Sequence, residues 1–297
     1  MRRVLYWLVS LIAACMLLLG ATGCRGERAD GPGAAAPGGS PLNIRMLDIG
    51  QGDAILLEKD GEWALIDSGD VDHRPQMKAY LKEYGVTRLS KVIITHAHAD
   101  HVGGMLAVFQ TVKVGEIYDS GVPTTTNTYR TYLKQIQAKK IPFHTIKTGD
   151  TITLFPGVDF QVAGPVKVLK EGKSGKPDLN NNSIVGRLVY GNFSMLFTGD
   201  AEKEEEKSIL AVGKDLKSQV LKVGHHGSKT SSSAVFLRAV SPELALISAG
   251  AGNSYGLPHP VTLKTLEKAG VRTLRTDRDG TITLTTDGQG YTVTARK

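Results

Sequence analysis

Apolar and polar positions follow two rhythms along the chain from residue 42 onward. Some short segments are apolar throughout or at every second position, which is typical of buried strands. Other segments repeat apolar residues at helical spacing, as between Arg74 and Tyr84. Turn residues such as Gly50-Gln51-Gly52 separate the segments. The pattern predicts strands at 42–48, 54–58, 63–67, 92–94, 151–154, 158–163, 183–190, 193–198, 219–223, 244–248, 281–285 and 291–295, and helices at 74–84, from 101, at 128–138, from 201, at 231–240 and at 260–269.

The order of these elements indicates the fold class. Each half of the chain begins with strands and continues with strands and helices in alternation, although no sequence repeat is evident. Such elements bury their apolar faces when two sheets pack together and helices cover the outside. We therefore expect one α/β domain at residues 42–297.

The first residues have a different pattern. Arg2 and Arg3 precede an apolar run at 4–19. This run is too short and wrongly flanked for a membrane-spanning helix, and it predicts a secretory signal at 1–23. Small residues directly before Cys24 resemble the bacterial lipoprotein cleavage box, although that box usually has Leu where Ala21 stands. We expect a lipid at Cys24; ordinary signal cleavage and an uncleaved anchor are the alternatives. All three place the domain outside the cytoplasmic membrane, anchored to its outer face or secreted.

Composition adds two constraints. Residues 24–41, rich in Gly, Ala and Pro, predict a flexible tether. Cys15 and Cys24 are the only cysteines, so a mature chain that begins at Cys24 has no internal disulfide. Removing residues 1–23 takes away two arginines and lowers the formal charge from +7 to +5. A mildly basic surface suits an anionic partner such as nucleic acid or an anionic membrane.

The strongest chemical signal is His96-Ala-His98-Ala-Asp100-His101, in a chain with only eight histidines. Imidazole and carboxylate groups are costly to bury unless something pairs with them, and a metal would pair with all four. His96 and His98, two apart on an extended segment, can chelate one ion. Asp100 and His101, at the turn into a helix, are placed to hold a second ion. Nitrogen and oxygen ligands without a thiolate favour zinc, manganese or iron.

Other candidates follow predicted strands. Asp67 ends one strand, so its carboxylate can reach the histidine loop or form a turn. Asp200 ends another and can bind metal or cap the helix that follows. His225 and His226 should point in opposite directions, so we expect His226 to be the ligand and His225 to lie beside the substrate; the reverse stays open. Asp53 is interpreted as a residue that shapes its loop.

Several residues are candidates for substrate binding. Residues 227–233 lead into a helix. The free N–H groups at its start can form an anion site with Ser228 and Lys229; alternatively, a serine simply caps the helix. Asn182 can bind a phosphate oxygen or form hydrogen bonds at the start of a strand. His259 can complete the site or lie exposed on a loop.

The histidine motif resembles the signature of the metallo-β-lactamase fold superfamily. "MLDIGQGDA" (46–54), "LIDSG" (65–69), "LFTGD" (196–200), "KVGHHGS" (222–228) and "NSYGLPH" (253–259) also occur in the order seen in the hydrolase domain of the ComEC-type DNA-uptake proteins. The resemblance covers about residues 42 to 296. It implies a four-layer αββα sandwich of two mixed β-sheets, with helices outside and a dinuclear site along the sheet edges.

The resemblance also implies residue roles. Asp200 would bridge two ions, and Asp67 would orient ligands without binding metal. No third histidine occurs near Asn182, so water or substrate would complete the first site. The chain departs from the pattern at Leu257, where relatives usually have His. Asp100 and His225 are the expected catalytic residues.

Two divalent ions, zinc or manganese, suit the hydrolysis of a phosphodiester or another ester. A basic, exported relative of the DNA-uptake hydrolases is most simply an extracytoplasmic phosphodiesterase or nuclease, with DNA as a possible substrate. The channel part of the ComEC proteins is absent, so transport is not predicted. The alternatives are an esterase for small phosphodiesters such as choline phosphates, a β-lactam hydrolase, and a metal-dependent binding lipoprotein without turnover, which only Leu257 supports.

Overall fold

The computed structural model describes residues 38–171 and 175–297. The predicted signal peptide at 1–23, the lipidation at Cys24 and most of the tether at 24–41 lie outside these residues. Within the described part of the chain, no helix has the length and apolar character needed to cross a membrane.

Eight strands of the described chain form the first sheet, in the order β15-β14-β1-β2-β3-β4-β5-β6. The strands from β15 to β3 pair antiparallel, and those from β3 to β6 pair parallel. Their bounds are β1 Leu42–Met46, β2 Ala54–Lys59, β3 Glu62–Ser68, β4 Arg88–Ile94, β5 Lys113–Asp119, β6 Phe143–Thr145, β14 Thr281–Thr286 and β15 Tyr291–Arg296.

The second sheet has the same plan. Its strands, in the order β13-β12-β11-β10-β9-β8-β7, are parallel from β13 to β10 and antiparallel from β10 to β7. Both sheets are therefore mixed. The bounds are β7 Thr151–Phe155, β8 Val158–Gly164, β9 Val185–Tyr190, β10 Phe193–Phe197, β11 Val220–Lys222, β12 Leu244–Ile247 and β13 Arg272–Arg275.

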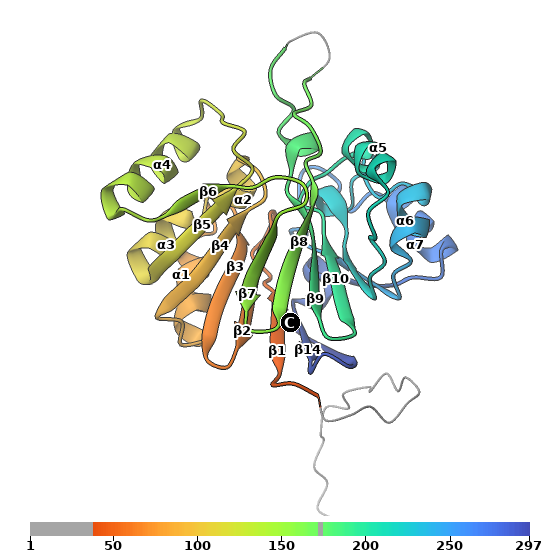
Figure 1. Cartoon of the computed structure of the whole chain (residues 1–297), viewed down its shortest axis with the longest axis horizontal. Helices are drawn as coiled ribbons and strands as arrows, with labels where there is room; N and C mark the ends of the chain where they lie inside the picture. Colours follow the sequence, from red (N-terminus) through yellow and green to blue (C-terminus); the bar gives the residue numbers. More distant parts are fainter. Residues whose placement is uncertain (1–37, 172–174) are drawn as a thin grey trace, which may run out of the picture.

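Helices cover the outer face of each sheet (Figure 1). On the first sheet these are α1 (Arg74–Glu83), α3 (Met105–Thr111) and α4 (Asn127–Lys139); on the second they are α5 (Lys203–Val212), α6 (Ala234–Val240) and α7 (Pro260–Lys268). Shorter helical turns are α2 (Ala99–Val102), η1 (Asn180–Asn182), η2 (Gly224–Gly227) and α8 (Thr276–Asp279). The predicted four-layer αββα sandwich is confirmed.

Three apolar cores explain the layers. Alternate residues of β1 and β10 point into the core between the sheets, where Ile44 and Phe197 are buried with Phe160. Successive residues of β3 face opposite sides: Ile66 lies between the sheets, whereas Leu65 lies in the second core, under the helices of the first sheet. The third core lies under the helices of the second sheet and contains Leu196 of β10 and Ile209 of α5. Each such side chain contributes about 1.5–3 kcal/mol when fully buried. A strand that is buried on both faces has apolar residues along its whole length, and this pattern made such strands predictable from the sequence.

Three predicted helix starts are wrong by a few residues. The helix expected at His101 begins at Ala99, and the one expected at 201 begins at Lys203, because Glu202 is still extended. The helix expected at 231 begins at Ala234, because the Ser233 side chain accepts a hydrogen bond from Phe236 N and caps it. The prediction also missed β5, β6 and β13. β6 is exposed along its length, β13 is at most half-buried and β5 has only two buried residues, so none of the three carries an apolar run.

Candidate metal centre

The candidate ligands follow the carboxyl ends of strands in both sheets. His96 to His101 come after β4, and Asp200 comes after β10. Parallel strands bring their carboxyl ends to one edge of a sheet, where sites are commonly built. Gly199 lets the two loops approach closely: its φ is +48°, and a Cβ there would lie 2.9 Å from Thr95 Cβ. The loops from the two sheets therefore meet at the seam between them.

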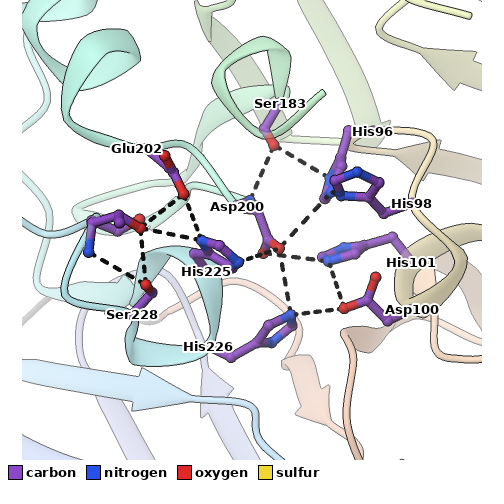
Figure 2. Close-up of polar contacts among 12 residues, drawn as sticks. His96, His98, Asp100, His101, Ser183, Asp200, Glu202, His225, His226 and Ser228 are labelled. Atoms are coloured by element: carbon purple, nitrogen blue, oxygen red, sulfur yellow. Dashed lines mark hydrogen bonds and ion pairs between the residues drawn. The ribbon is translucent and has the colours of Figure 1, made fainter. Parts of the chain in front are cut away.

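Four side chains converge at this seam: Asp100, His101, Asp200 and His226 (Figure 2). One ligand atom from each lies within 4.8 Å of the others. His101 Nε2 is 3.3 Å from Asp200 Oδ1. His226 Nε2 is 3.2 Å from Asp100 Oδ2 and 3.5 Å from Asp200 Oδ2. The structure thus brings together four of the six predicted metal ligands in one cluster.

The cluster fits a divalent cation. His101 Nε2 and Asp200 Oδ1 are buried, and neither atom makes a hydrogen bond to the described residues. Buried polar atoms without partners are rare and costly, so an ion between them would supply the missing interaction. Two carboxylates and two imidazoles without a thiolate are ligands that zinc and manganese accept.

His96 and His98 form a second group beside this cluster. His96 Nε2 lies 3.0 Å from His98 Nδ1 and 3.9 Å from Asp200 Oδ2. Asp200 is therefore the residue that faces both groups, as a ligand shared between two ions must. Ser183 Oγ is 3.3 Å from His96 Nδ1 and accepts a hydrogen bond from Asp200 N at 3.1 Å, so this serine links the two groups.

Asp67 orients the histidine loop. Its carboxylate is fully buried and accepts hydrogen bonds from Thr95 N at 2.8 Å and Thr95 Oγ1 at 2.7 Å. His101 Nδ1 lies 2.8 Å from Asp67 Oδ2. Because a carboxylate accepts, Nδ1 carries a proton, and Nε2 faces the cluster. These contacts are those of a residue that orients ligands.

The two adjacent histidines take different places. His226 is 1% exposed, and its Nδ1 donates to Ser248 O at 3.0 Å, so its Nε2 is directed at Asp100 and Asp200. The His225 side chain is 26% exposed and lies at the side of the cluster, with Nε2 3.8 Å from Asp200 Oδ2. Glu202 Oε1 is 2.9 Å from His225 Nδ1. The sequence prediction missed Glu202, which looked like one of several charges at the start of a helix.

Charges in the cluster shift its pKa values. Burial opposes the charged form of His101 and His226, but the carboxylates around them, Asp200 foremost, raise the pKa of both well above the usual value. Burial likewise opposes the charged form of Asp200, but His226 and His101 hold its pKa well below the usual range. The cluster is thus balanced by protons that an entering cation must displace.

A buried ion pair lies beneath His226. Lys222 Nζ is 2.6 Å from Asp53 Oδ2, and both side chains are 1% exposed. Burial disfavours the Asp53 carboxylate, but Lys222, His226 and His101 together outweigh burial and lower the pKa of Asp53 to about 2. The interpretation of Asp53 as a loop-shaping residue was therefore incomplete. Asp53, Asp67 and His101 also lie within 4.8 Å of one another, but Lys222 and His101 Nδ1 already face these carboxylates.

The predicted anion site at the start of α6 is wrong. The Glu206 side chain accepts hydrogen bonds from Ser232 N and from Ser233 N, the latter at 3.0 Å, so these N–H groups are already used. Ser228 is 5% exposed, and its Oγ forms a hydrogen bond with Thr230 Oγ1 at 2.9 Å within the same turn. The serine-capped helix, the plainer alternative, is the one observed.

Asn182 is also wrong as a substrate-binding residue. It is fully buried, and its amide bonds Leu169 N at 3.0 Å and Leu169 O at 2.8 Å, which fixes the preceding loop. Lys229 is exposed, and its backbone N donates to His259 Nδ1 at 3.1 Å. These two residues remain beside each other at the rim. Leu257 is 9% exposed, and Asn253 ties its backbone into the loop.

Comparisons with known proteins agree with this geometry. The model of the metallo-beta-lactamase superfamily matches residues 47–251. ComE operon protein 3 of Bacillus subtilis is 31% identical over 257 residues, which cover 80% of this chain and 32% of that protein. Competence protein ComA of Neisseria gonorrhoeae is 34% identical over 241 residues, covering 80% and 31%. The chain thus spans about a third of the length of these curated relatives.

Among solved structures, the metallo-beta-lactamase fold protein YhfI from Bacillus subtilis aligns with a TM-score of 0.51 and 11% identity, covering 80% of this chain and 96% of that one. At this identity the likeness concerns the fold alone. The family match spans more than half of the chain and includes the histidine loop and the residues of the cluster. The chain belongs to the metallo-β-lactamase superfamily.

Proposed function

We propose that this protein is an exported, lipid-anchored phosphodiesterase that uses two divalent ions and acts on nucleic acid. The observation that carries the proposal is the place of Asp200, which faces both the Asp100–His101–His226 group and the His96–His98 group. In hydrolases with two metals, the ions activate a water and stabilise the negative charge that builds on a phosphoryl oxygen.

The chain's own residues would divide the remaining work. Asp67 and Ser248 hold the Nδ1 protons of His101 and His226, so that Nε2 of each is directed to an ion. Glu202 orients His225, whose other nitrogen faces Asp200 and the open side of the site. From there His225 can hold a proton for the leaving oxygen. Lys229 and His259 at the rim can contact a phosphate next to the one being cleaved.

The nature of the relatives supports a nucleic-acid substrate. The curated matches include a competence protein, and the chain resembles the hydrolase part of DNA-uptake proteins. A mildly basic chain is compatible with a polyanion. Because this chain spans about a third of those relatives, their complete activity is not transferred to it.

The activity test uses the purified chain from residue 38 onward with Mn²⁺ or Zn²⁺. It should cleave an activated phosphodiester, and it should degrade DNA or RNA at a rate that falls steeply with salt, because lysine contacts to phosphates release counterions. Asp200→Asn should abolish both activities, whereas Asp159→Asn, on β8 and outside the cluster, should retain them.

Other outcomes would identify other functions. Turnover of a choline-phosphate ester without salt dependence would indicate a small-phosphodiester esterase. Hydrolysis of a β-lactam without turnover of any phosphodiester would exclude the proposal. Protein that binds metal and is inert on every ester would indicate a binding lipoprotein.

The proposed lipid anchor has a separate test. Cells grown with a palmitate analogue should label the wild-type protein at Cys24, and Cys24→Ala should release the protein from the membrane or leave it unprocessed. Labelling of Cys24→Ala would show that the lipid is attached elsewhere.

A further inference from the structure

The Asp53–Lys222 pair joins the two sheets beneath the candidate metal centre. Lys222 ends β11 of the second sheet, and Asp53 precedes β2 of the first. The ammonium of Lys222 also donates to Val223 O at 2.9 Å, so the lysine is held from both sides. With 1% exposure on each side chain, this ion pair has no direct access to solvent.

The pair touches two of the candidate ligands. Asp53 Oδ1 lies 3.4 Å from His226 Nδ1, the nitrogen that carries the proton. Asp53 N donates to Asp100 O at 3.1 Å. The neighbouring Gly52 O accepts from Ser248 Oγ at 2.6 Å, and Ser248 O is the other acceptor at His226 Nδ1. The Asp53 segment therefore supports both Asp100 and His226.

Buried charges constrain what this carboxylate can do. A buried anion is strongly disfavoured unless neighbouring groups offset its charge, so the Asp53 carboxylate needs such partners. Lys222 supplies the compensating charge from the side away from the histidine. The carboxylate can then stabilise the Nδ1 proton, fix the ring and increase the basicity of Nε2, as partners of metal-bound histidines do.

We propose that Asp53 and Lys222 form a positioning pair for His226 and thereby set the affinity of the ion bound by Asp100, His101, Asp200 and His226. This inference rests on the metal centre of the proposed function. The competing role is a simple cross-link between the sheets, which would affect folding but not the choice of ion site. The two roles differ in what happens when both charges are removed together.

The test measures Zn²⁺ binding by competition with a chromophoric chelator, and unfolding of the metal-free protein in parallel. His226→Ala should abolish one of the two binding steps. Lys222→Met should weaken Zn²⁺ binding in that same step by about 10–100-fold and leave the other step unchanged. Lys59→Met is the matched control: Lys59 is also buried and ion-paired, but it lies at the opposite end of β2 from Asp53. It should leave both binding steps as in the wild type.

The double variant Asp53→Asn/Lys222→Met removes both charges, so no unpaired ion remains buried in the fold. A positioning pair predicts that the same binding step stays weakened about 10-fold or more. Wild-type affinity for both ions in the folded double variant would overturn the inference, as would equal weakening of both steps. Because the readout is ion binding, failure of the phosphodiesterase assay would not affect it.

Discussion

The ligand role of each histidine at this site depends on what holds its other ring nitrogen. Asp67 faces Nδ1 of His101, and Ser248 O accepts from Nδ1 of His226. Nδ1 of His225 instead faces Glu202 at the edge of the site. The hydrogen-bond partner of Nδ1 thus distinguishes a candidate metal ligand from a histidine with another role, even where the two histidines are adjacent in sequence.

This difference predicts distinct variants. His226→Ala should lose one of two bound ions, because Nε2 of His226 lies within reach of both carboxylates of the cluster. His225→Ala should keep both ions and lose most turnover. Metal analysis of the purified variants together with phosphodiester hydrolysis checks both outcomes, and loss of an ion only from His225→Ala would reverse the assignment.

Asp100 offers a charge test at the same cluster. Asp100→Asn keeps the size of the side chain but removes one anion, so the protein should lose one ion and most activity. Elemental analysis against the wild type measures the loss. Asp159→Asn serves as the control because it removes a carboxylate of β8 outside the cluster. Full metal occupancy in Asp100→Asn would remove Asp100 from the ligand set.

At the scale of elements, α5 carries a buried carboxyl group that does not belong to the site. Glu205 is fully buried, and neither side-chain oxygen makes a hydrogen bond to the described residues. Burial raises its pKa to about 8; the backbone N–H of Val166 opposes this rise, and the charge of Asp178 adds a smaller increase. The helix therefore packs with Glu205 in its neutral form at neutral pH.

The raised pKa predicts a pH-dependent stability. In the unfolded chain Glu205 releases its proton near pH 4.5, but in the folded chain only near pH 8. The folded state therefore binds the extra proton between these values, and the free energy of unfolding should fall as pH rises, by at most about 1.4 kcal/mol per unit. Glu205→Gln should remove this slope in urea unfolding with a chelator present. Glu204→Gln, its exposed neighbour, should retain it.

The start of α3 depends on one glycine. A Cβ at Gly104 would lie 1.9 Å from Ser68 O, a backbone atom at the end of β3. Gly104→Ala should therefore cost about 1–3 kcal/mol of unfolding free energy, because the helix or the strand must move. Gly290→Ala, where no atom lies within 4 Å of the added Cβ, should be nearly neutral in the same urea titration. Equal stability of the two variants would contradict the tight contact.

The sequence predicted what depends on neighbours along the chain. β4 is an apolar run that leads directly into the histidine motif, so the strand and four candidate ligands could be identified together. The contacts of Asp53 with Lys222 and of Glu206 with Ser233 join distant segments, and no local pattern marks them. The predicted anion site at the start of α6 is wrong for this reason, because the group that accepts from its N–H groups is the Glu206 carboxylate of α5.

At the scale of the whole molecule, the candidate ligands are divided between the two sheets. The histidine loop follows β4 of the first, whereas Asp200 and His226 follow β10 and β11 of the second. An ion bound by both sides stabilises only the state in which the sheets are packed together. Metal binding and folding should therefore be linked.

The linkage predicts a metal-dependent unfolding temperature. The unfolding temperature should be higher with Zn²⁺ than with a chelator. The free energy of unfolding should rise by about 1.4 kcal/mol for each tenfold increase in free Zn²⁺ above the dissociation constant. His226→Ala should show a smaller shift, because fewer ligands cross the seam. Identical melting curves with Zn²⁺ and with chelator would exclude ion binding across the sheets.

The division of ligands also concerns the lifetime of the protein. Without ions, Asp100 and Asp200 meet at the rim with only protons on the histidines to offset their charge, while the apolar core between the sheets stays closed. Opening should then begin locally, in the loops that carry the ligands, and expose them to proteases. Scarcity of metal would thus mark this protein for degradation at the same loops on which its chemistry depends.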